Sequence, residues 1–269
     1  MHRITASYFV LLIATTLLAD EIQIDASKWG SLEGRFLYDG KPPVREPLVP
    51  IRRAEAFAAE PLLDQTLMVH EKNRGVANVV IWLSRDRNAP LPPIHPSFED
   101  SSEAEVEINV TPRSFKPRAV LLRTTQSLQL VNDDTVATNF KIDSIINRPY
   151  NVLVPAGTRF NTPLSFSKAE RIPVKVSSSI YPWVQGHLFV QDHPYFAVTD
   201  ANGRFEIKDL PVGDWTFRTW HERNGYLHGE VTVGMIKQQW KRGEFEVTIT
   251  AGENDIREIY IPPLYFKPA

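Results

Sequence analysis

His221 and Glu222 form the neighbouring pair in this 269-residue chain that most suggests acid–base chemistry. A catalytic pair needs a third group that orients it or a nucleophile that it activates. The sequence contains no G-x-S-x-G motif, no H-E-x-x-H motif and no phosphate-binding glycine loop. We therefore interpret the pair as polar residues at the end of a strand, and we expect no enzyme activity.

Metal binding is the second kind of chemistry that the residue types raise. The chain has no cysteine, which excludes disulfides and thiolate metal sites. The histidines that follow the N-terminal segment are His70, His95, His187, His193, His221 and His228. None of them lies at a tight ligand spacing, so we interpret them as structural or surface residues. A mononuclear zinc or copper site assembled from distant histidines stays open as an alternative.

Strands dominate the expected secondary structure that must position these residues. The chain has 21 prolines and many short alternating runs, such as RFEIK (204–208), where Phe205 and Ile207 alternate with charged residues. Further strands are expected at 105–110, 118–123, 127–132, 172–176, 186–191, 214–220, 244–250 and 256–261. VANVVIWL (76–83) suits a strand buried on both faces. One short helix is expected at 52–60, before Pro61.

The N-terminal segment, residues 1–19, has the features of a secretory signal peptide. Arg3 precedes an apolar run at 8–18, and a small residue, Ala19, precedes an acidic pair. The run is too short to span a bilayer, although retention as an anchor is the alternative. We expect cleavage near Ala19, export to the periplasm or the medium, and no membrane span in the mature chain. The formal charge of −2 without charge runs argues against a nucleic-acid partner.

The segment VTDANGRFEIKDLPVGDWTF (198–217) resembles the carboxypeptidase regulatory-like family, which has a transthyretin-like β-sandwich. The matching residues are Thr199, Asp200, Gly203, Phe205, Leu210, Pro211, Gly213 and Trp215. The opening strand of that family resembles GSLEGRFLYDGKP, more than 150 residues upstream at 30–42. The resemblance implies one sandwich in two parts, residues 29–88 and 195–262.

Between the two parts, residues 104–194 resemble a cupredoxin. The matching motifs are FKP (115–117), NDDTVATN (132–139) and VKVSSSIYPWV (174–184). The two resemblances together imply an all-β chain with a cupredoxin-like Greek-key sandwich inserted in, or adjacent to, a transthyretin-like sandwich. They also imply a bacterial exported protein.

The resemblance places the four copper-ligand positions of a cupredoxin on Thr138, Ser178, Tyr181 and Val184. A type 1 copper site uses two imidazoles, a thiolate and a weak axial thioether. All four positions are substituted, and a serine hydroxyl does not ionise near neutral pH as a thiol does. We therefore expect no cofactor and no metal, with copper as the alternative.

These observations lead to one expected function and two alternatives. We expect a non-catalytic, copper-free scaffold or adaptor of the cell envelope, with a partner patch at Tyr181, Pro182 and Trp183. An electron-transfer protein with a non-standard copper site is the first alternative. A carbohydrate-binding module is the second, because Trp220, Tyr226 and Trp240 could stack on sugars. The partner is expected to be an envelope protein or a glycan.

Overall fold

The computed structural model describes residues 25–48, 62–86 and 89–266. The expected signal peptide at 1–19 and the expected helix at 52–60 lie outside these ranges. In the described residues the regular structure is strand, apart from three short 3-10 helices: η1 (Ala26–Lys28), η2 (Pro96–Phe98) and η3 (Pro263–Phe266). The all-β prediction is confirmed. No helix in the described ranges is long and apolar enough to cross a membrane.

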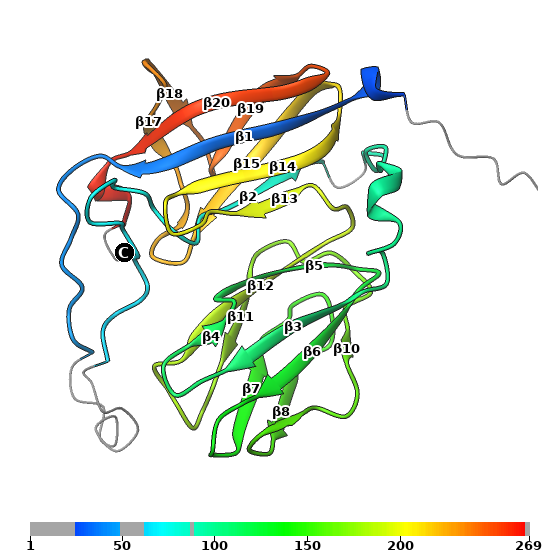
Figure 1. Cartoon of the computed structure of the whole chain (residues 1–269), viewed down its shortest axis with the longest axis vertical. Helices are drawn as coiled ribbons and strands as arrows, with labels where there is room; N and C mark the ends of the chain where they lie inside the picture. The colour runs from blue at the N-terminus through cyan, green and yellow to red at the C-terminus, as the bar shows by residue number, and fades with distance from the viewer. Residues whose placement is uncertain (1–24, 49–61, 87–88, 267–269) are drawn as a thin grey trace, which may run out of the picture.

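The first sandwich combines strands from both ends of the described chain (Figure 1). One sheet has the order β14 (Arg204–Pro211), β1 (Trp29–Tyr38), β20 (Gly252–Ile261), β17 (Gly229–Val233), β18 (Ile236–Trp240). The other contains β13 (Phe196–Val198), β2 (Val80–Ser84), β15 (Gly213–His221) and β16 (Gly225–Tyr226), with β19 (Glu244–Ile249) paired to β15. Phe36, Phe217 and Trp240 are among the side chains buried between these sheets.

The second sandwich is formed by the intervening part of the chain and lies below the first in Figure 1. One sheet contains β10 (Leu164–Ser165), β6 (Ser127–Asn132), β3 (Glu105–Val110) and β4 (Phe115–Lys116), with β9 (Thr158–Arg159) paired to β6. The other has the order β5 (Ala119–Arg123), β12 (Gln185–Gln191), β11 (Val174–Ser177), β7 (Thr138–Ile142), β8 (Tyr150–Val154). Phe115, Phe140 and Phe166 belong to its core.

The pattern of apolar and polar residues explains which faces of the strands are buried. Two strand boundaries differ from those expected from the sequence. In β14, Phe205 and Ile207 are buried and their neighbours are exposed, because only one face of the strand meets the core. β2 is buried on both faces, as its apolar run predicts. It starts at Val80 rather than Val76, since Asn78 has a φ of 62° and breaks the strand. Residues 252–255, expected to separate two strands, instead belong to β20.

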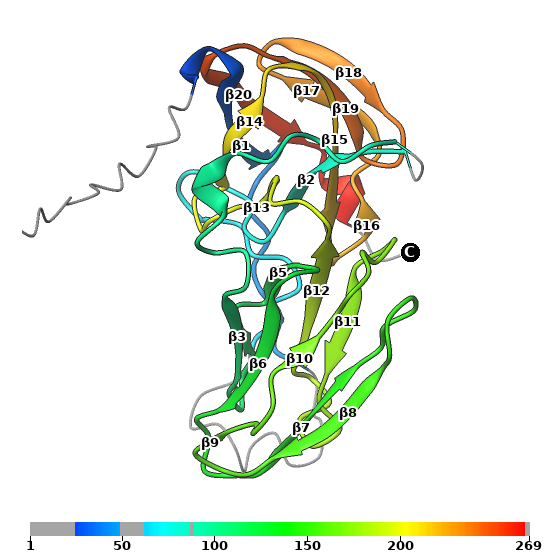
Figure 2. The ribbon, with the colours of Figure 1, turned by 90° about the vertical axis from the view of Figure 1, so that its right-hand side faces the viewer.

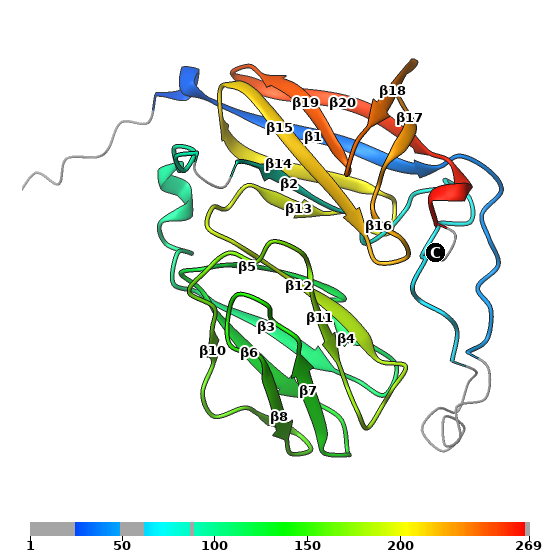
Figure 3. The same ribbon diagram turned by 180° about the vertical axis from the view of Figure 1, so that it is seen from behind.

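A mixed apolar and polar junction joins the two sandwiches, and Figure 3 shows β16 reaching toward β12. Val80 and Trp82 of the first sandwich form one buried cluster with Ala119 and Phe189 of the second. Arg118 pairs with Glu222 across this junction, and Arg85 pairs with Asp192. Ordinary core packing together with buried charge therefore joins the two halves.

Candidate functional site

The four positions that the sequence assigned to vestigial copper ligands lie together at one end of the second sandwich. Thr138 begins β7, Ser178 directly follows β11, and Tyr181 and Val184 lie in the loop before β12. β11 pairs antiparallel with both β7 and β12, so the start of β7 and the end of β11 meet at one edge. The backbone hydrogen bonds Ser178 N–H to Val184 O (3.3 Å) and Val184 N–H to Tyr181 O (2.8 Å) close the loop.

Hydroxyl and amide groups fill the centre of this end. The Oγ1 of Thr138 and the Oγ of Ser178 lie 3.3 Å apart, and both residues are buried. The Ser178 oxygen also accepts the backbone N–H groups of residues 180 and 181, each at 3.1 Å. Asn139 Oδ1 accepts the backbone N–H of Ser179 at 2.8 Å and lies 3.4 Å from Ser178 Oγ. These polar groups therefore satisfy one another.

Tyr181 is paired with a carboxylate that the sequence interpretation did not assign. Its hydroxyl donates to Asp134 Oδ2 at 2.5 Å, and its side chain is fully buried. Burial and the Asp134 charge both raise the pKa of the Tyr181 phenol. The phenol is therefore a neutral hydrogen-bond donor at any physiological pH. Asp134 lies in the NDDTVATN motif, close in sequence to the ligand position at Thr138. An acidic residue at that place in the motif could have suggested a hydrogen-bond partner for this end of the sandwich.

The residues at this end do not suit a copper ion. Thr138 and Ser178 supply neutral oxygens, the phenol of Tyr181 keeps its proton, and Val184 is a buried aliphatic side chain. Type 1 copper sites depend on thiolate and imidazole ligands. Within the described residues, no group of three metal-ligating His, Asp or Glu side chains comes together.

The expected partner patch at residues 181–183 is wrong for Tyr181. That side chain has no exposed surface, because it turns inward to reach Asp134. Trp183 is half-buried and donates its indole N–H to Pro112 O at 2.7 Å, while its ring lies 5.6 Å from that of Tyr181. Pro182 is the exposed member of the three.

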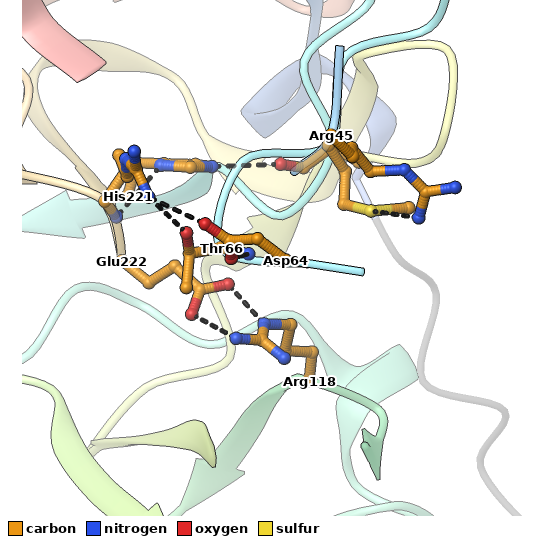
Figure 4. Close-up of polar contacts among 9 residues, drawn as sticks. Arg45, Asp64, Thr66, Arg118, His221 and Glu222 are labelled. Carbon is orange, nitrogen blue, oxygen red and sulfur yellow. Dashed lines mark hydrogen bonds and ion pairs between the residues drawn. The ribbon is translucent and has the colours of Figure 1, made fainter. Parts of the chain in front are cut away.

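The junction contains a second buried polar cluster, around the His221 and Glu222 pair. Glu222 accepts two hydrogen bonds from the Arg118 guanidinium, one of them from Nη2 at 2.7 Å, and its side chain is 5% exposed. His221 points away from Glu222 in Figure 4, toward the Ala77 carbonyl at 3.3 Å. The next residue, Arg223, donates to Asp64 at 2.9 Å and Thr66 at 2.7 Å. His221 and Glu222 therefore contact different partners, the Ala77 carbonyl and the Arg118 guanidinium.

Burial sets the protonation of this cluster. It lowers the pKa of His221 to about 3 and that of His187 to about 4, and the positive charge of Arg118 adds to both shifts. Burial also raises the pKa of Glu222, and Arg118 offsets part of that rise. The imidazoles are therefore neutral at pH 7. Arg118 lies 104 positions before Glu222, and no local sequence pattern predicts that these two residues pair.

The remaining histidines have structural roles or lie on the surface. His193 is buried, its Nδ1 accepts the Tyr195 N–H at 3.2 Å, and burial lowers its pKa to about 4. His95 caps η2 through the Ser97 N–H, and His70 accepts the backbone N–H groups of residues 72 and 73. His228 is exposed.

The three aromatic residues considered for sugar stacking are engaged within the protein. Trp240 is 2% exposed and stacks on Phe245 at 4.7 Å, so it is a core residue. Trp220 is half-buried at the junction, 4.6 Å from the His187 ring and 5.3 Å from the Phe189 ring. Tyr226 is half-buried too, and Arg218 lies over its ring.

Comparisons with known proteins give no family and only partial similarity to solved structures. No family model matches this sequence, and no curated protein matches it. Among solved structures, a purple cupredoxin from Nitrosopumilus maritimus is similar, with 18% identity, 32% of this chain and 98% of that chain covered, and a TM-score of 0.26. A reduced mutant of amicyanin shares 9% identity over 32% of this chain and 82% of its own, with a TM-score of 0.29.

A copper-containing nitrite reductase from Thermus scotoductus is also similar, at 17% identity and a TM-score of 0.29. The match covers 40% of this chain and 25% of the reductase. Identities and TM-scores this low transfer neither a metal nor an activity to this chain. The resemblance to the carboxypeptidase regulatory-like family stays a prediction from the sequence.

Proposed function

We propose that this protein is an exported, non-catalytic β-sandwich scaffold or adaptor of the cell envelope that holds no copper at its cupredoxin-like loop end. The contact between Thr138 and Ser178 supports this proposal most directly. Two hydroxyls occupy the places where the resemblance implies an imidazole and a thiolate, and they lie 3.3 Å apart. That separation is a hydrogen-bond distance, and neither hydroxyl is the imidazole or thiolate on which a type 1 copper site depends.

The neighbouring contacts support the same proposal. The Ser178 oxygen accepts two backbone N–H groups, and the Tyr181 hydroxyl donates a hydrogen bond to Asp134. A metal would have to displace these hydrogen bonds and gain only neutral oxygen ligands in return. Displacement of satisfied buried hydrogen bonds is unfavourable.

Copper titration of the purified mature protein tests the proposal. We expect no intense blue charge-transfer band on addition of copper(II) and no copper retained after gel filtration. The matched positive control is the variant T138H/S178C/Y181H/V184M, which restores the ligand types of a type 1 site at the same positions. A blue band from the unmodified protein would contradict the proposal and favour the electron-transfer alternative.

Export is a second part of the proposal and has its own test. The apolar run at 8–18 and the small residue Ala19 support a cleaved signal peptide. Fractionation of the source cells and N-terminal sequencing should find the protein outside the cytoplasm, starting near Asp20. An intact Met1 on a membrane-bound product would favour the retained anchor.

The binding alternatives are separated by a glycan array. Because Trp240 is in the core and Trp220 packs in the junction, we expect no glycan signal that depends on these rings. A signal that W220A abolishes without unfolding the protein would favour the carbohydrate-binding module. Co-purification of a defined envelope protein would favour the adaptor.

A further inference from the structure

Two loops of the second sandwich are joined into one rigid surface by a buried carboxylate. Glu170 is 4% exposed, and its carboxylate accepts the backbone N–H groups of Ile145 (3.4 Å), Ile146 (3.1 Å) and Asn147 (2.9 Å). The Asn147 side chain in turn donates to the Lys168 carbonyl at 2.7 Å and accepts the Lys168 N–H at 3.1 Å. Residues 144–148 and 168–172, which we call the basic platform, are therefore fixed relative to each other.

The platform exposes apolar and basic side chains together, which are the groups that make up protein-binding surfaces. Three isoleucines are exposed, Ile145 at 68%, Ile146 at 36% and Ile172 at 46%. Arg148, Lys168 and Arg171 lie in the same two segments, are exposed, and form no ion pair with any described residue. Ile146 and Arg171 line one cleft of about 580 Å³ between the sandwiches, which places the apolar and basic groups side by side.

A surface of opposite charge lies elsewhere on the same chain. Residues 99–105, which we call the acidic ridge, expose four carboxylates that form no ion pair within the described residues: Glu99, Asp100, Glu103 and Glu105. Leu91 and Ile94, 49% and 45% exposed, precede the ridge in the chain. The segment from Leu91 to Glu105 therefore exposes both apolar and acidic side chains, whereas the platform exposes apolar and basic ones.

The acidic ridge is also fixed by a buried residue of opposite charge. Arg123 is 7% exposed, and its guanidinium donates to the Phe98 carbonyl at 3.0 Å and to Ser101 Oγ at 2.9 Å. Gln126 adds a hydrogen bond to the Ser101 carbonyl at 3.0 Å. Because both surfaces are ordered before contact, association would not have to order a mobile loop.

No ion pair joins the two surfaces within the described residues of one molecule. The ridge leads into β3, whereas the platform joins β7 to β8 and precedes β11, and these strands belong to opposite sheets of the second sandwich. Figure 2 shows β3 on one side of this sandwich and β8 on the other. Because these charges are unpaired among the described residues of the molecule, they are available for pairing between molecules.

We propose that the basic platform of one molecule docks on the acidic ridge of a second copy, so that the chain self-associates head to tail. Such a contact is heterologous, because each molecule contacts one neighbour through its platform and another neighbour through its ridge. Heterologous contacts give rings or open chains rather than a closed two-fold dimer. This inference goes beyond the proposed scaffold function and stands whether or not copper binds at the loop end. The contact between exposed charges is salt-sensitive.

Analytical ultracentrifugation of the full mature chain with two charge-reversed variants tests the proposal. K168E/R171E makes the platform acidic, and D100K/E103K makes the ridge basic. We expect the weight-average mass of the unmodified protein to rise with concentration at about 0.05 M salt and to fall at about 0.5 M salt. Each variant alone should weaken association at least about tenfold, because like charges then face each other. An equimolar mixture of the two variants should recover association, because acidic platforms then meet basic ridges.

The controls distinguish this contact from a general effect of charge or unfolding. K41E/K72E changes net charge by the same amount as K168E/R171E at exposed sites on the first sandwich, and it should leave association intact. Thermal unfolding should show that all variants fold, since every substituted side chain is exposed. An unmodified protein that stays monomeric at low salt would overturn the proposal. Association that survives both reversals, or that the mixture fails to recover, would overturn it too.

Discussion

The loop end and the junction each bury a polar cluster, but they place charge differently. At the loop end, Thr138, Asn139 and Ser178 form neutral hydrogen bonds, and the carboxylate that pairs with Tyr181, Asp134, is half-buried. The junction buries the ionised pair of Arg118 and Glu222 beside His187 and His221. Neutral groups that satisfy one another cost little to bury, whereas buried charge is tolerated only while its partner is present. The junction should therefore depend strongly on partner residues and pH, and the loop end should not.

Removal of Arg118 should produce the largest loss of stability. R118M leaves Glu222 buried without its partner, and the expected cost at pH 7 is about 3–5 kcal/mol of unfolding free energy. The loss should shrink as the pH is lowered and Glu222 takes up a proton. Urea unfolding followed by tryptophan fluorescence measures it. The double variant R118M/E222L is the control and should recover most of the loss, since it leaves no unpaired charge. A double variant as unstable as the single one would show that packing, rather than charge, carries the effect.

The junction histidines should make stability fall in acid. A histidine whose pKa is lowered on folding binds its proton more readily in the unfolded chain, where its pKa is about 6.5. The stability that neutral His187 contributes is therefore complete above pH about 6.5 and is lost as the pH falls toward about 4. Each such histidine contributes a slope of about 1.4 kcal/mol per pH unit within this window, to a total of about 3 kcal/mol for His187.

The variant H187Q should reduce that slope by one histidine's share. His193 and His221, whose pKa values are lowered to about 4 and about 3, should retain the rest. Glu222 has the opposite effect on stability, because its pKa is raised on folding. Its contribution to the unfolding free energy falls as the pH rises above the pKa of a glutamate in the unfolded chain. Urea unfolding between pH 4 and pH 7 measures the slope, and NMR titration of the His187 ring locates its midpoint. An unchanged slope in H187Q would remove this residue from the pH response.

Local patterns in the sequence were enough for the all-β fold, but not for the contacts at the junction. Alternating residues such as Phe205 and Ile207 fix which face of a strand is buried, so the all-β fold followed from the sequence. Arg118 and Glu222 meet across 104 positions of chain, and no local pattern records such a pairing. The same limit explains the patch error, because the inward turn of Tyr181 depends on Asp134, 47 positions away.

Removal of the Ser178 hydroxyl should produce an intermediate effect at the loop end. S178A leaves the backbone N–H groups of residues 180 and 181 without their acceptor, and the latter is buried. The expected cost is about 1–3 kcal/mol of unfolding free energy, without the pH dependence expected at the junction. S179A, at the exposed neighbouring position, should change stability by no more than about 0.5 kcal/mol. Thermal unfolding of the three proteins under one condition ranks them, and equal losses in both variants would argue against the acceptor role.

Replacement of the Thr138 hydroxyl by a methyl group should produce the smallest effect, below about 1 kcal/mol of unfolding free energy. T138V keeps the shape of the side chain, and the hydrogen bond that is lost is the one between the Thr138 and Ser178 hydroxyls, at 3.3 Å. Ser178 can then direct its proton to Asn139 Oδ1, at 3.4 Å, so no buried group is left without a partner. The new methyl group lies next to the apolar core that contains Phe140 and Val184. Chemical unfolding of T138V beside S178A measures the difference. A loss in T138V as large as that in S178A would mean that the hydroxyl has an additional role at this end, such as a ligand or a partner, and would count against a closed, metal-free loop end.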